Sequence, residues 1–266
     1  YLTVTAPKLN IVYEDENILL VDKKPGMAVH PHDGAEYGRT LIDHIQAYLY
    51  VKGEWRPREE QAFTPALCNR IDRNTGGIVI AAKTAEALRI LNQKIRDREL
   101  DKRYLAVVEG TPRPETGVLK GYLFKDAVKN RVFVTDTPQK GAKTCETRYR
   151  TLTKRGGLSL VECELITGRT HQIRVHMSWQ GHPLFNDERY GGDRILKGTT
   201  FSKYKQFIEN CFAVMPRHAL HAQSLGFVHP MTHEAVYFES ELPDDFRALL
   251  EKWDTYAAAS KESNNG

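Results

Sequence analysis

The stretch LCNRIDRNTGGIVIAAKT, residues 67–84, places one carboxylate between two arginines just before an apolar run. The carboxylate is Asp72, and the arginines are Arg70 and Arg73. A Gly-Gly turn signal follows, and residues 78–82 then read as a buried strand. Most loop aspartates accept backbone hydrogen bonds in a turn, so that structural interpretation of Asp72 stays open on this stretch alone.

The composition is that of an ordinary globular protein. With 266 residues, 41% of them hydrophobic and 27% charged, the chain can bury a sizeable core. Its apolar runs are too short to cross a bilayer, and its first residues lack a signal-peptide pattern. We therefore expect a cytoplasmic protein without membrane contact. The scattered cysteines, none in a Cys-x-x-Cys pair, are expected to be reduced and buried: Cys68, Cys145, Cys163 and Cys211.

The positive charge is concentrated in one segment. Residues 120–155 hold ten Lys or Arg against three acids, a net of +7 in a chain whose total is +4. Such a cluster suits a polyanion, because cations that neutralise phosphates release condensed counterions. A solvated hairpin whose charges only maintain solubility is the competing interpretation.

Strand signals outnumber helix signals along the chain. Two short strands flank the acidic turn 15–17, and a loop covers residues 51–65. Further strands are expected at 102–110 and at 147–168, the latter a pair joined at Gly156-Gly157. Helices are expected at 40–49 with Thr40 as N-cap, at 84–100 with Leu88, Leu91 and Ile95 facing inward, and at 244–253. No repeat or low-complexity linker appears, so the sequence predicts one α+β domain with a large, mostly antiparallel sheet.

A second notable stretch is ELITGRTHQIRVHMSWQGHPLFNDERYGG, residues 164–192. Its apolar residues alternate as in a strand, yet Thr170 could cap a helix that Gly181 ends, and periodicity alone slightly favours the strand. Polar and cationic side chains gather after its Thr-Gly turn, where backbone N–H groups can meet an anion: Arg169, His171, Gln172 and Arg174. A strand end with solvated charges would explain them equally well.

Five segments in order resemble the pseudouridine synthases of the large-subunit ribosomal RNA type, the RluA-like family. KPGMAVHP (24–31) resembles the first motif, and NRIDRNTGG (69–77) the motif that carries the catalytic aspartate. KRYLAVVEG (102–110) resembles the strand with the active-site tyrosine, and GRTHQIRVHM with GHPLFNDERYGG (168–192) the third motif. RHALHAQSLGFVHP (217–230) resembles the closing strands. Each is weak singly, but five in order are a strong signal.

The resemblance implies a fold and domain limits. We expect a single pseudouridine-synthase-type catalytic domain over residues 10–254, with a large mixed, mostly antiparallel sheet flanked by helices and a catalytic cleft across the middle. The family pattern makes the third motif a helix, from about Thr170 to Gln180. Residues 1–9 would end a missing upstream S4-like RNA-binding domain or a linker. Residues 255–266 are expected to form a disordered tail.

The resemblance also implies roles for particular residues. Asp72 is the catalytic carboxylate, Arg174 the cation that keeps it ionised, and Tyr104 the ring that stacks on the target uracil. Arg70 would fill the space that a flipped nucleotide leaves in the RNA, and Ile173 would close the other side of the base. The remaining substrate-binding candidates are Arg169, His171 and Gln172.

Three positions depart from the family pattern. Asn69 stands where His is usual, Gly76 where Ser is usual, and Ile71 where Leu is common. None removes a group that the chemistry requires. Because position 69 is Asn, any role that the family assigns to an imidazole there is in doubt. Gly76 could loosen the turn behind Asp72.

The implied reaction is isomerisation of specific uridines to pseudouridine in structured RNA, most often 23S ribosomal RNA. Because no group is added or lost, no redox cofactor, nucleotide or metal is expected. The pairs His218-x-x-His221 and His229-x-x-x-His233 lack a third ligand at compatible spacing. We expect a monomer that binds RNA. The alternatives are a non-catalytic RNA-binding module, a synthase acting on transfer RNA, and a nucleoside hydrolase, which would want two carboxylates.

Overall fold

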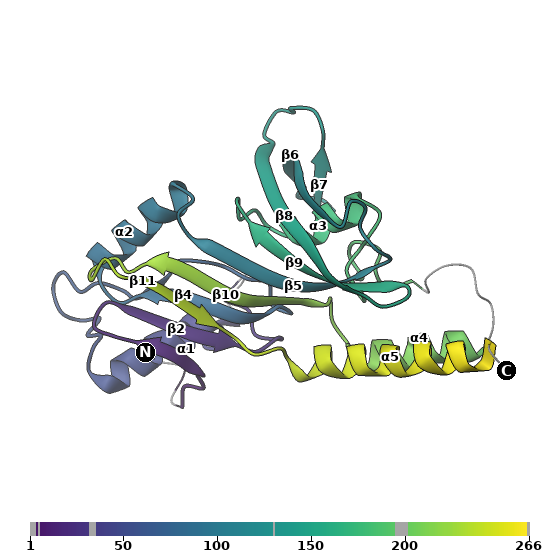
Figure 1. Ribbon diagram of the computed structural model, residues 1–266. Coiled ribbons are helices and arrows are strands. Elements are labelled where there is room, and N and C mark those ends of the chain that lie inside the picture. The colour runs from purple at the N-terminus through teal and green to yellow at the C-terminus, as the bar shows by residue number, and fades with distance from the viewer. Residues whose placement is uncertain (1–3, 5, 32–35, 130, 195–201, 265–266) are drawn as a thin grey trace. The chain divides into compact units, whose positions relative to one another are not determined.

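The computed structural model describes residues 4, 6–31, 36–129, 131–194 and 202–264. Most of its strands and helices are labelled in Figure 1. The strands are β1 (Ile11–Glu14), β2 (Ile18–Lys23), β3 (Ala66–Leu67), β4 (Gly76–Ala82), β5 (Asp101–Glu109), β6 (Thr116–Asp126), β7 (Arg131–Thr135), β8 (Lys143–Lys154), β9 (Leu158–Leu165), β10 (Leu220–Val228) and β11 (Ala235–Glu239). The helices are α1 (Leu41–Lys52), α2 (Ala85–Arg96), α3 (Gln172–Trp179), α4 (Ser202–Val214) and α5 (Asp244–Asn264).

The chain divides into two compact units. The first unit holds residues 1–102 and 222–240, and the second holds residues 103–221 and 241–266. In the first unit the strand order is β1-β2-β4-β10, with β11 on β10 and β3 on β4. In the second unit it is β5-β9-β8-β6-β7. The registered pairs in both units are antiparallel, which confirms the α+β prediction with a mostly antiparallel sheet.

The first unit packs α2 against one face of its sheet. The core there is formed by Ile18, Leu20, Ile78, Ile80, Ala82, Ala87, Leu91, Leu100, Leu225 and Phe227, with Leu88 and Ile95 at its edge. The inward face expected for helix 84–100 is therefore confirmed. Thr84 caps α2, since its side chain accepts a hydrogen bond from the Ala87 N–H at 3.2 Å. Thr40 precedes α1 as predicted and donates to the Asp43 carboxylate from its N–H and its hydroxyl.

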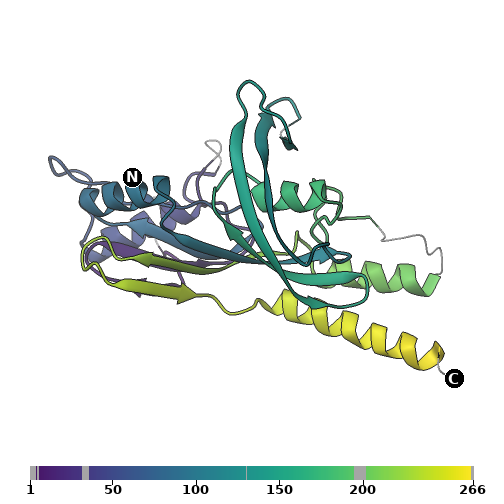
Figure 2. The same cartoon turned by 45° about the horizontal axis from the view of Figure 1, so that its top comes forward.

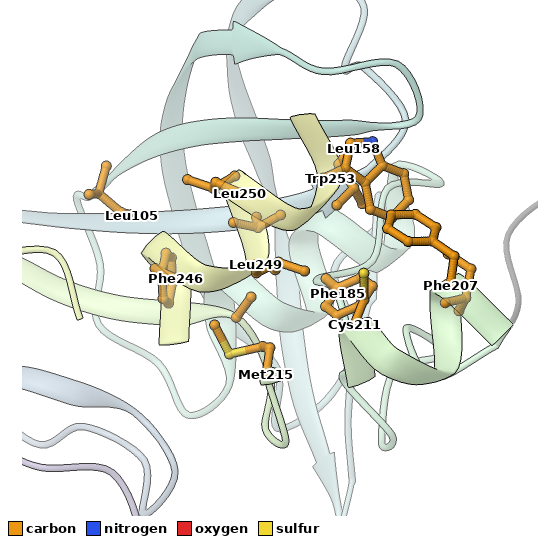
Figure 3. Packing of buried hydrophobic residues seen from close by; sticks show 13 residues of the cluster. Leu105, Leu158, Phe185, Phe207, Cys211, Met215, Phe246, Leu249, Leu250 and Trp253 are labelled. Carbon is orange, nitrogen blue, oxygen red and sulfur yellow. The ribbon is translucent and has the colours of Figure 1, made fainter. Parts of the chain in front are cut away.

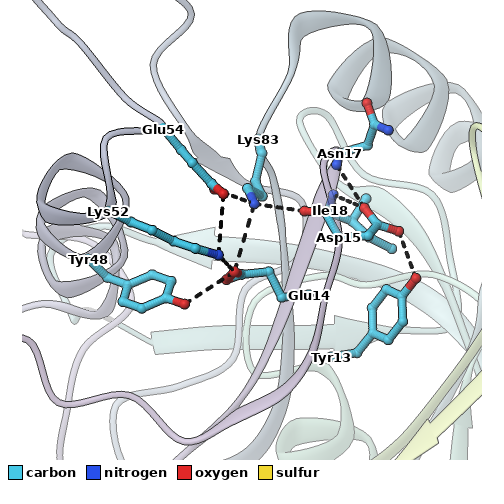
Figure 4. Close-up of polar contacts among 9 residues, drawn as sticks. All are labelled: Tyr13, Glu14, Asp15, Asn17, Ile18, Tyr48, Lys52, Glu54 and Lys83. Carbon is cyan, nitrogen blue, oxygen red and sulfur yellow. Dashed lines mark hydrogen bonds and ion pairs between the residues drawn. The ribbon is translucent and has the colours of Figure 1, made fainter.

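A polar cluster ties β1 to α1 and to the end of β4 in the first unit (Figure 4). Glu14 accepts a hydrogen bond from Tyr48 at 3.1 Å and forms an ion pair with Lys52. Lys83 pairs with Glu54 at 2.5 Å and donates to the Asp15 carbonyl at 2.7 Å. The Lys83 side chain is only 5% exposed, whereas that of Glu54 is 36% exposed, so solvent screens the pair in part. The cluster fixes the edge of the sheet next to α1.

The second unit places helices on both faces of its sheet. Near β7 and β8, α3 packs on residues that include Leu123, Val132 and Cys145. The other face of β5 and β9 carries Leu105, Val107 and Leu158, which pack against α4 and α5. Figure 3 shows Phe246, Leu249 and Leu250 of α5 opposite Phe185, Cys211 and Met215. This aromatic and aliphatic cluster is the main core of the unit.

Helix α5 corrects the expectation of a disordered tail. It continues from Asp244 to Asn264, and in Figures 1 and 2 it lies beside α4. The Tyr256 ring stacks on Phe207 of α4 at 4.0 Å between centroids. The segment 255–264 contains no Gly or Pro and includes three consecutive alanines, so its helix propensity supports this packing. Residues 265–266 lie outside the described part of the chain.

Helix α4 has no counterpart among the sequence-based predictions. Its inward positions Tyr204, Phe207, Ile208 and Cys211 follow the spacing i, i+3, i+4, i+7. That spacing is the mark of an amphipathic helix and could have identified it. In the part of the chain that the structure describes, no helix is both long and apolar enough to span a membrane. Three of the four free cysteines are buried as expected, and Cys68 is half-buried.

Candidate active site

Asp72 lies on the loop between β3 and β4 in the first unit, and hydrogen bonds to backbone carbonyls fix this loop. The Thr75 N–H donates to the Asp72 carbonyl at 3.0 Å and closes a turn. The next carbonyl, that of Arg73, accepts from the Gly26 N–H at 2.7 Å and from Lys23 Nζ at 3.0 Å. Asp72 itself is half-buried. The loop is thus held through its main chain.

The first motif of the resemblance, residues 24–31, supports this loop. Lys23, just before the motif, is buried and also donates to the carbonyl of Lys24 at 3.0 Å. A Cβ on Gly76 would lie 3.0 Å from Pro25 Cδ, so the glycine allows close packing there. The glycine therefore tightens the contact behind Asp72, whereas the sequence raised the concern of a loosened turn.

A second glycine, Gly77, brings β4 against β10 in the first unit. It has φ +125°, and a Cβ there would lie 2.0 Å from the Ala222 carbonyl oxygen. No other residue fits without moving the backbone. Nearby, the Asn69 amide bridges two points of β4: it donates to the Ile78 carbonyl at 3.3 Å and accepts from the Ile80 N–H at 2.8 Å. Asn69 therefore has a structural role at this position.

The two arginines beside Asp72 have different surroundings. Arg70 is exposed. Arg73 forms an ion pair with Glu36. The pattern of one carboxylate between two cations therefore arises from an outward-facing arginine and a second one that binds an acid elsewhere in the unit.

Helix α3 carries Arg174 in the second unit, which confirms the helix that the family pattern predicted in the third motif. The strand that the alternation of apolar residues favoured is not formed there. Arg174 is buried and binds Asp187 through two parallel hydrogen bonds, Nε to Oδ2 at 2.8 Å and Nη2 to Oδ1 at 2.9 Å. The Arg174 guanidinium carbon also lies 5.1 Å from the centroid of the Tyr190 ring. This bidentate pair and the ring hold the guanidinium plane in one orientation.

Gln172 is enclosed by protein groups at both ends of its amide. Its Oε1 accepts from the Thr167 hydroxyl at 2.7 Å and from the Arg169 N–H at 3.1 Å. Its Nε2 donates to the Glu146 carbonyl and the Thr147 hydroxyl, both at 2.9 Å. With 2% of its surface exposed, Gln172 organises the turn before α3.

His176 continues this network on the next turn of α3. Its Nδ1 lies 2.7 Å from Thr147 Oγ1 and its Nε2 lies 3.3 Å from Cys145 Sγ. Burial lowers the pKa of His176 to about 4, so the ring is neutral near pH 7. Because Thr147 Oγ1 accepts a hydrogen bond from Gln172 Nε2, the threonine hydroxyl can donate its own proton to His176 Nδ1. The ring proton then lies on Nε2 and faces the Cys145 sulfur.

The other third-motif candidates surround the start of α3. His171 has φ +55°, a left-handed conformation, and its Nδ1 lies 2.7 Å from the Tyr190 hydroxyl. Arg169 donates from Nε to the Thr144 carbonyl at 3.0 Å. Ile173 is buried, with 3% of its surface exposed. The structure thus gathers all five third-motif candidates at one end of one helix.

Tyr104 faces the same side of the second unit's sheet as α3. On β5 it pairs with Cys163 of β9, which pairs with Tyr149 of β8. Side chains two apart on a strand share a face, so Tyr149 shares its face with Cys145 and Thr147, which contact α3. Tyr104 is 7% exposed. Asp72 and Arg70 belong to the first unit, so their meeting with Tyr104 and Arg174 stays a prediction.

Sequence reasoning did not single out Asp187 and Tyr190. Asp187 is 1% exposed and binds Arg174, and Tyr190 is 2% exposed. Burial raises the pKa of Tyr190, so its hydroxyl stays protonated near neutral pH. A carboxylate and a tyrosine in FNDERYGG, residues 185–192, which begins six residues after the helix that carries Arg174 ends, were the available signal. Among the described residues, no group of three or more His, Cys, Asp or Glu side chains could hold a metal ion.

Comparison with known proteins identifies the family. The family model described as RNA pseudouridylate synthase matches residues 17–179. An uncharacterized RNA pseudouridine synthase of Chlorobaculum parvum is 38% identical over 255 residues, 95% of this chain and 76% of that protein. Ribosomal large subunit pseudouridine synthase D of Zymomonas mobilis is 36% identical over 91% of this chain and 72% of its own length. The chain belongs to the RNA pseudouridylate synthase family, whose members are isomerases acting on RNA.

Solved structures show the same fold. Human RNA pseudouridylate synthase domain containing 4 matches with a TM-score of 0.68, at 22% identity, over 92% of each chain. The human domain containing 1 matches with a TM-score of 0.64, at 23% identity, over 93% of this chain and 88% of its own. At these identities the likeness establishes the fold, and the family assignment rests on the sequence matches.

Proposed function

We propose that this protein converts specific uridines of large-subunit ribosomal RNA to pseudouridine, with Asp72 as the catalytic carboxylate. The observation that carries the proposal is the family match over residues 17–179, which includes Asp72, Tyr104 and Arg174. The relatives named for the ribosomal large subunit support the choice of RNA. Transfer RNA is the alternative substrate. The protein would act as a monomer in the cytoplasm, and residues 10–254 would carry the activity.

The reaction breaks the bond from uracil N1 to the ribose, turns the base, and joins C5 to the same sugar carbon. Atoms balance without a cofactor, so the protein's own side chains must hold the base and act on the sugar or the ring. Asp72 must be ionised for this, whether it attacks the ribose, attacks the uracil or deprotonates a glycal-like intermediate. A loop fixed by its main chain suits a carboxylate that must stay in place.

Arg174 is proposed to act on Asp72 and keep it charged. Asp187 binds the Nε and Nη2 edge of the guanidinium, and Tyr190 contacts its plane. A preorganised cation within about 4–6 Å lowers a carboxylate pKa by roughly 1–3 units. The ion pair with Asp187 reduces the net positive charge of the Arg174 group and fixes the orientation of its guanidinium.

The remaining residues would bind the target nucleotide. Tyr104 would stack on the uracil and Ile173 would close its other side. The exposed Arg70 would enter the RNA stack where the target base has left. Arg169 and His171 would contact the backbone of the flipped nucleotide. Gln172, whose amide is used within the protein, would position α3.

The test is pseudouridine formation in unmodified ribosomal RNA, read by mass spectrometry of the digested RNA. We expect Asp72→Asn and Asp72→Ala to lose at least about a thousandfold in rate while keeping most of their RNA affinity. Asp97→Asn, an exposed carboxylate in the same unit, is the matched control and should be fully active. Appreciable turnover by either Asp72 variant would refute the catalytic assignment. Release of free uracil in place of pseudouridine would identify a hydrolase.

A further inference from the structure

Arg131, at the start of β7, lies against two aromatic rings in the second unit. Its guanidinium carbon is 5.1 Å from the Tyr190 ring centroid and 5.8 Å from that of Phe133. Contact with ring faces limits the orientations of the planar guanidinium and leaves its N–H edges available for hydrogen bonds. The residue is half-buried, and it lies outside the motifs that point to the site.

The Tyr190 ring connects Arg131 to the candidate active site. The same ring lies 5.1 Å from the Arg174 guanidinium carbon, so the two arginine groups are at most twice that distance apart. The Tyr190 hydroxyl contacts His171 at 2.7 Å and accepts from the Val132 N–H at 3.2 Å. Arg131 therefore belongs to the cluster that contains Arg174 and His171.

The two arginines differ in charge balance. Asp187 neutralises Arg174, whereas Arg131 has no carboxylate oxygen within 4.0 Å in the described part of the chain. Asp126, its pairing partner on β6, accepts instead from the N–H groups of Val128 and Lys129. The Nε of Arg131 is buried and makes no hydrogen bond to a described residue. A buried donor left so costs about 1–3 kcal/mol, so the protein holds this guanidinium in place at a cost in stability.

We propose that Arg131 binds a phosphate of the RNA strand next to the target nucleotide. The proposal rests on the proposed function and adds a substrate-binding residue to it. A guanidinium held by aromatic rings presents two parallel N–H groups to phosphate oxygens, a geometry that lysine cannot reproduce. The neighbouring Arg174 adds little competition for the phosphate, because it binds Asp187 and, in the proposed function, faces Asp72.

The test measures binding of an unmodified transcript of large-subunit ribosomal RNA as a function of salt. We expect Arg131→Ala to raise the Kd about tenfold and to lower the slope of log K against log salt by about 1, the loss of one phosphate contact. Arg131→Lys should keep most of the slope and lose part of the affinity. Arg150→Ala is the matched control, an exposed arginine on the same sheet paired with Glu162, and should change the Kd less than about twofold.

A purely structural role gives a different result. If Arg131 only supports the Tyr190 ring, Arg131→Ala lowers the unfolding midpoint, while its slope of log K against log salt equals that of Arg150→Ala. That result would overturn the proposal. If the alanine variant does not fold, the comparison of Arg131→Lys with Arg131→Gln decides, since only the glutamine variant should lose the slope. Pseudouridine formation by the parent protein is measured alongside. If the parent protein forms no pseudouridine but Arg131→Ala still lowers the salt slope, the proposed function is refuted and Arg131 remains an RNA contact.

Discussion

The loop that carries Asp72 and the helix that carries Arg174 are held in place by different means. Three donors fix the loop through main-chain carbonyls: the N–H groups of Gly26 and Thr75 and the ammonium of Lys23. Helix α3 is fixed by side chains, through the pair of Arg174 with Asp187 and the chain of bonds through Gln172 and His176. The first arrangement depends on backbone conformation, and the second on buried polar partners.

The difference shows which substitutions each region tolerates. A loop bound by its carbonyls accepts many side chains, provided that the backbone can adopt the same path. A helix bound by buried side chains accepts few, because removing one partner leaves another polar group buried without compensation. The strongest tests of this contrast are therefore two substitutions. One replaces a glycine of β4 directly after the Asp72 loop, and the other replaces the carboxylate that binds Arg174 of α3.

The largest effect is expected from Gly77→Ala. The new Cβ would lie 2.0 Å from the Ala222 carbonyl oxygen at a residue with φ +125°, so the strands must separate and the backbone must change. We expect a loss of about 4 kcal/mol or more in the free energy of unfolding, measured by urea titration.

The control is Gly26→Ala, also in the first unit. Gly26 has φ +101°, but no atom lies within 4 Å of a Cβ there. Only conformational strain applies, and we expect about 1 kcal/mol. Similar losses for the two variants would show that the close approach of β4 and β10 does not limit the fold.

Asp187→Ala is expected to come next. It leaves the Arg174 guanidinium buried without this carboxylate, and breaking a buried pair costs roughly 3–5 kcal/mol. Pseudouridine formation should also fall sharply, because the guanidinium is no longer oriented. Urea unfolding and the rate at saturating RNA measure the two effects.

The matched pair is Arg56 with Glu59, whose side chains are mostly exposed. Glu59→Ala should change the free energy of unfolding by less than about 0.5 kcal/mol. An Asp187→Ala variant as stable and as active as Glu59→Ala would break the contrast between the two regions.

The smallest effect concerns pH. Burial lowers the pKa of His176 to about 4, below its ordinary value near 6.5, so the unfolded chain binds this proton more readily than the folded protein. The stability that the neutral ring contributes is full above about pH 6.5 and is lost as pH falls toward 4. The loss amounts to roughly 3 kcal/mol over that window.

Unfolding of the parent and of His176→Asn should be compared between pH 7 and pH 4. The variant is less stable at pH 7, and its stability should fall less steeply with acid. His233→Asn is the control, because His233 is exposed and asparagine tolerates its left-handed backbone. Equal slopes for His176→Asn and the parent would show that the ring is not the titrating group.

The Asp72 loop and helix α3 also differ in how far the sequence alone could predict them. The Asp72 loop is contiguous, so its turn, its glycines and the strand after it are visible in one motif. The helix of the third motif was not visible in its periodicity, because α3 is buried around its whole circumference. Its residues 172–177 are all buried, which erases the amphipathic pattern.

The partners that fix α3 come from elsewhere in the chain. Thr147 and Glu146 belong to β8, and Tyr190 and Asp187 follow the helix. No local rule relates them, since only the pairing of β6, β7 and β8 brings them under one helix. Arg131 is the furthest example: on sequence it is one cation among ten in the basic segment. In the structure it is distinguished by contacts with two rings and by its buried Nε.

The length of α5 has a practical consequence for anyone who shortens or labels this chain. Composition would place the cut after residue 254, yet Tyr256 lies two residues beyond and covers Phe207. A chain cut there would expose the Phe207 ring and open the shallow groove that Val214, Ala248 and Thr255 line between the helices. Such a surface invites aggregation, which would be mistaken for poor expression. An affinity tag or a fluorophore belongs beyond Asn264, where α5 ends.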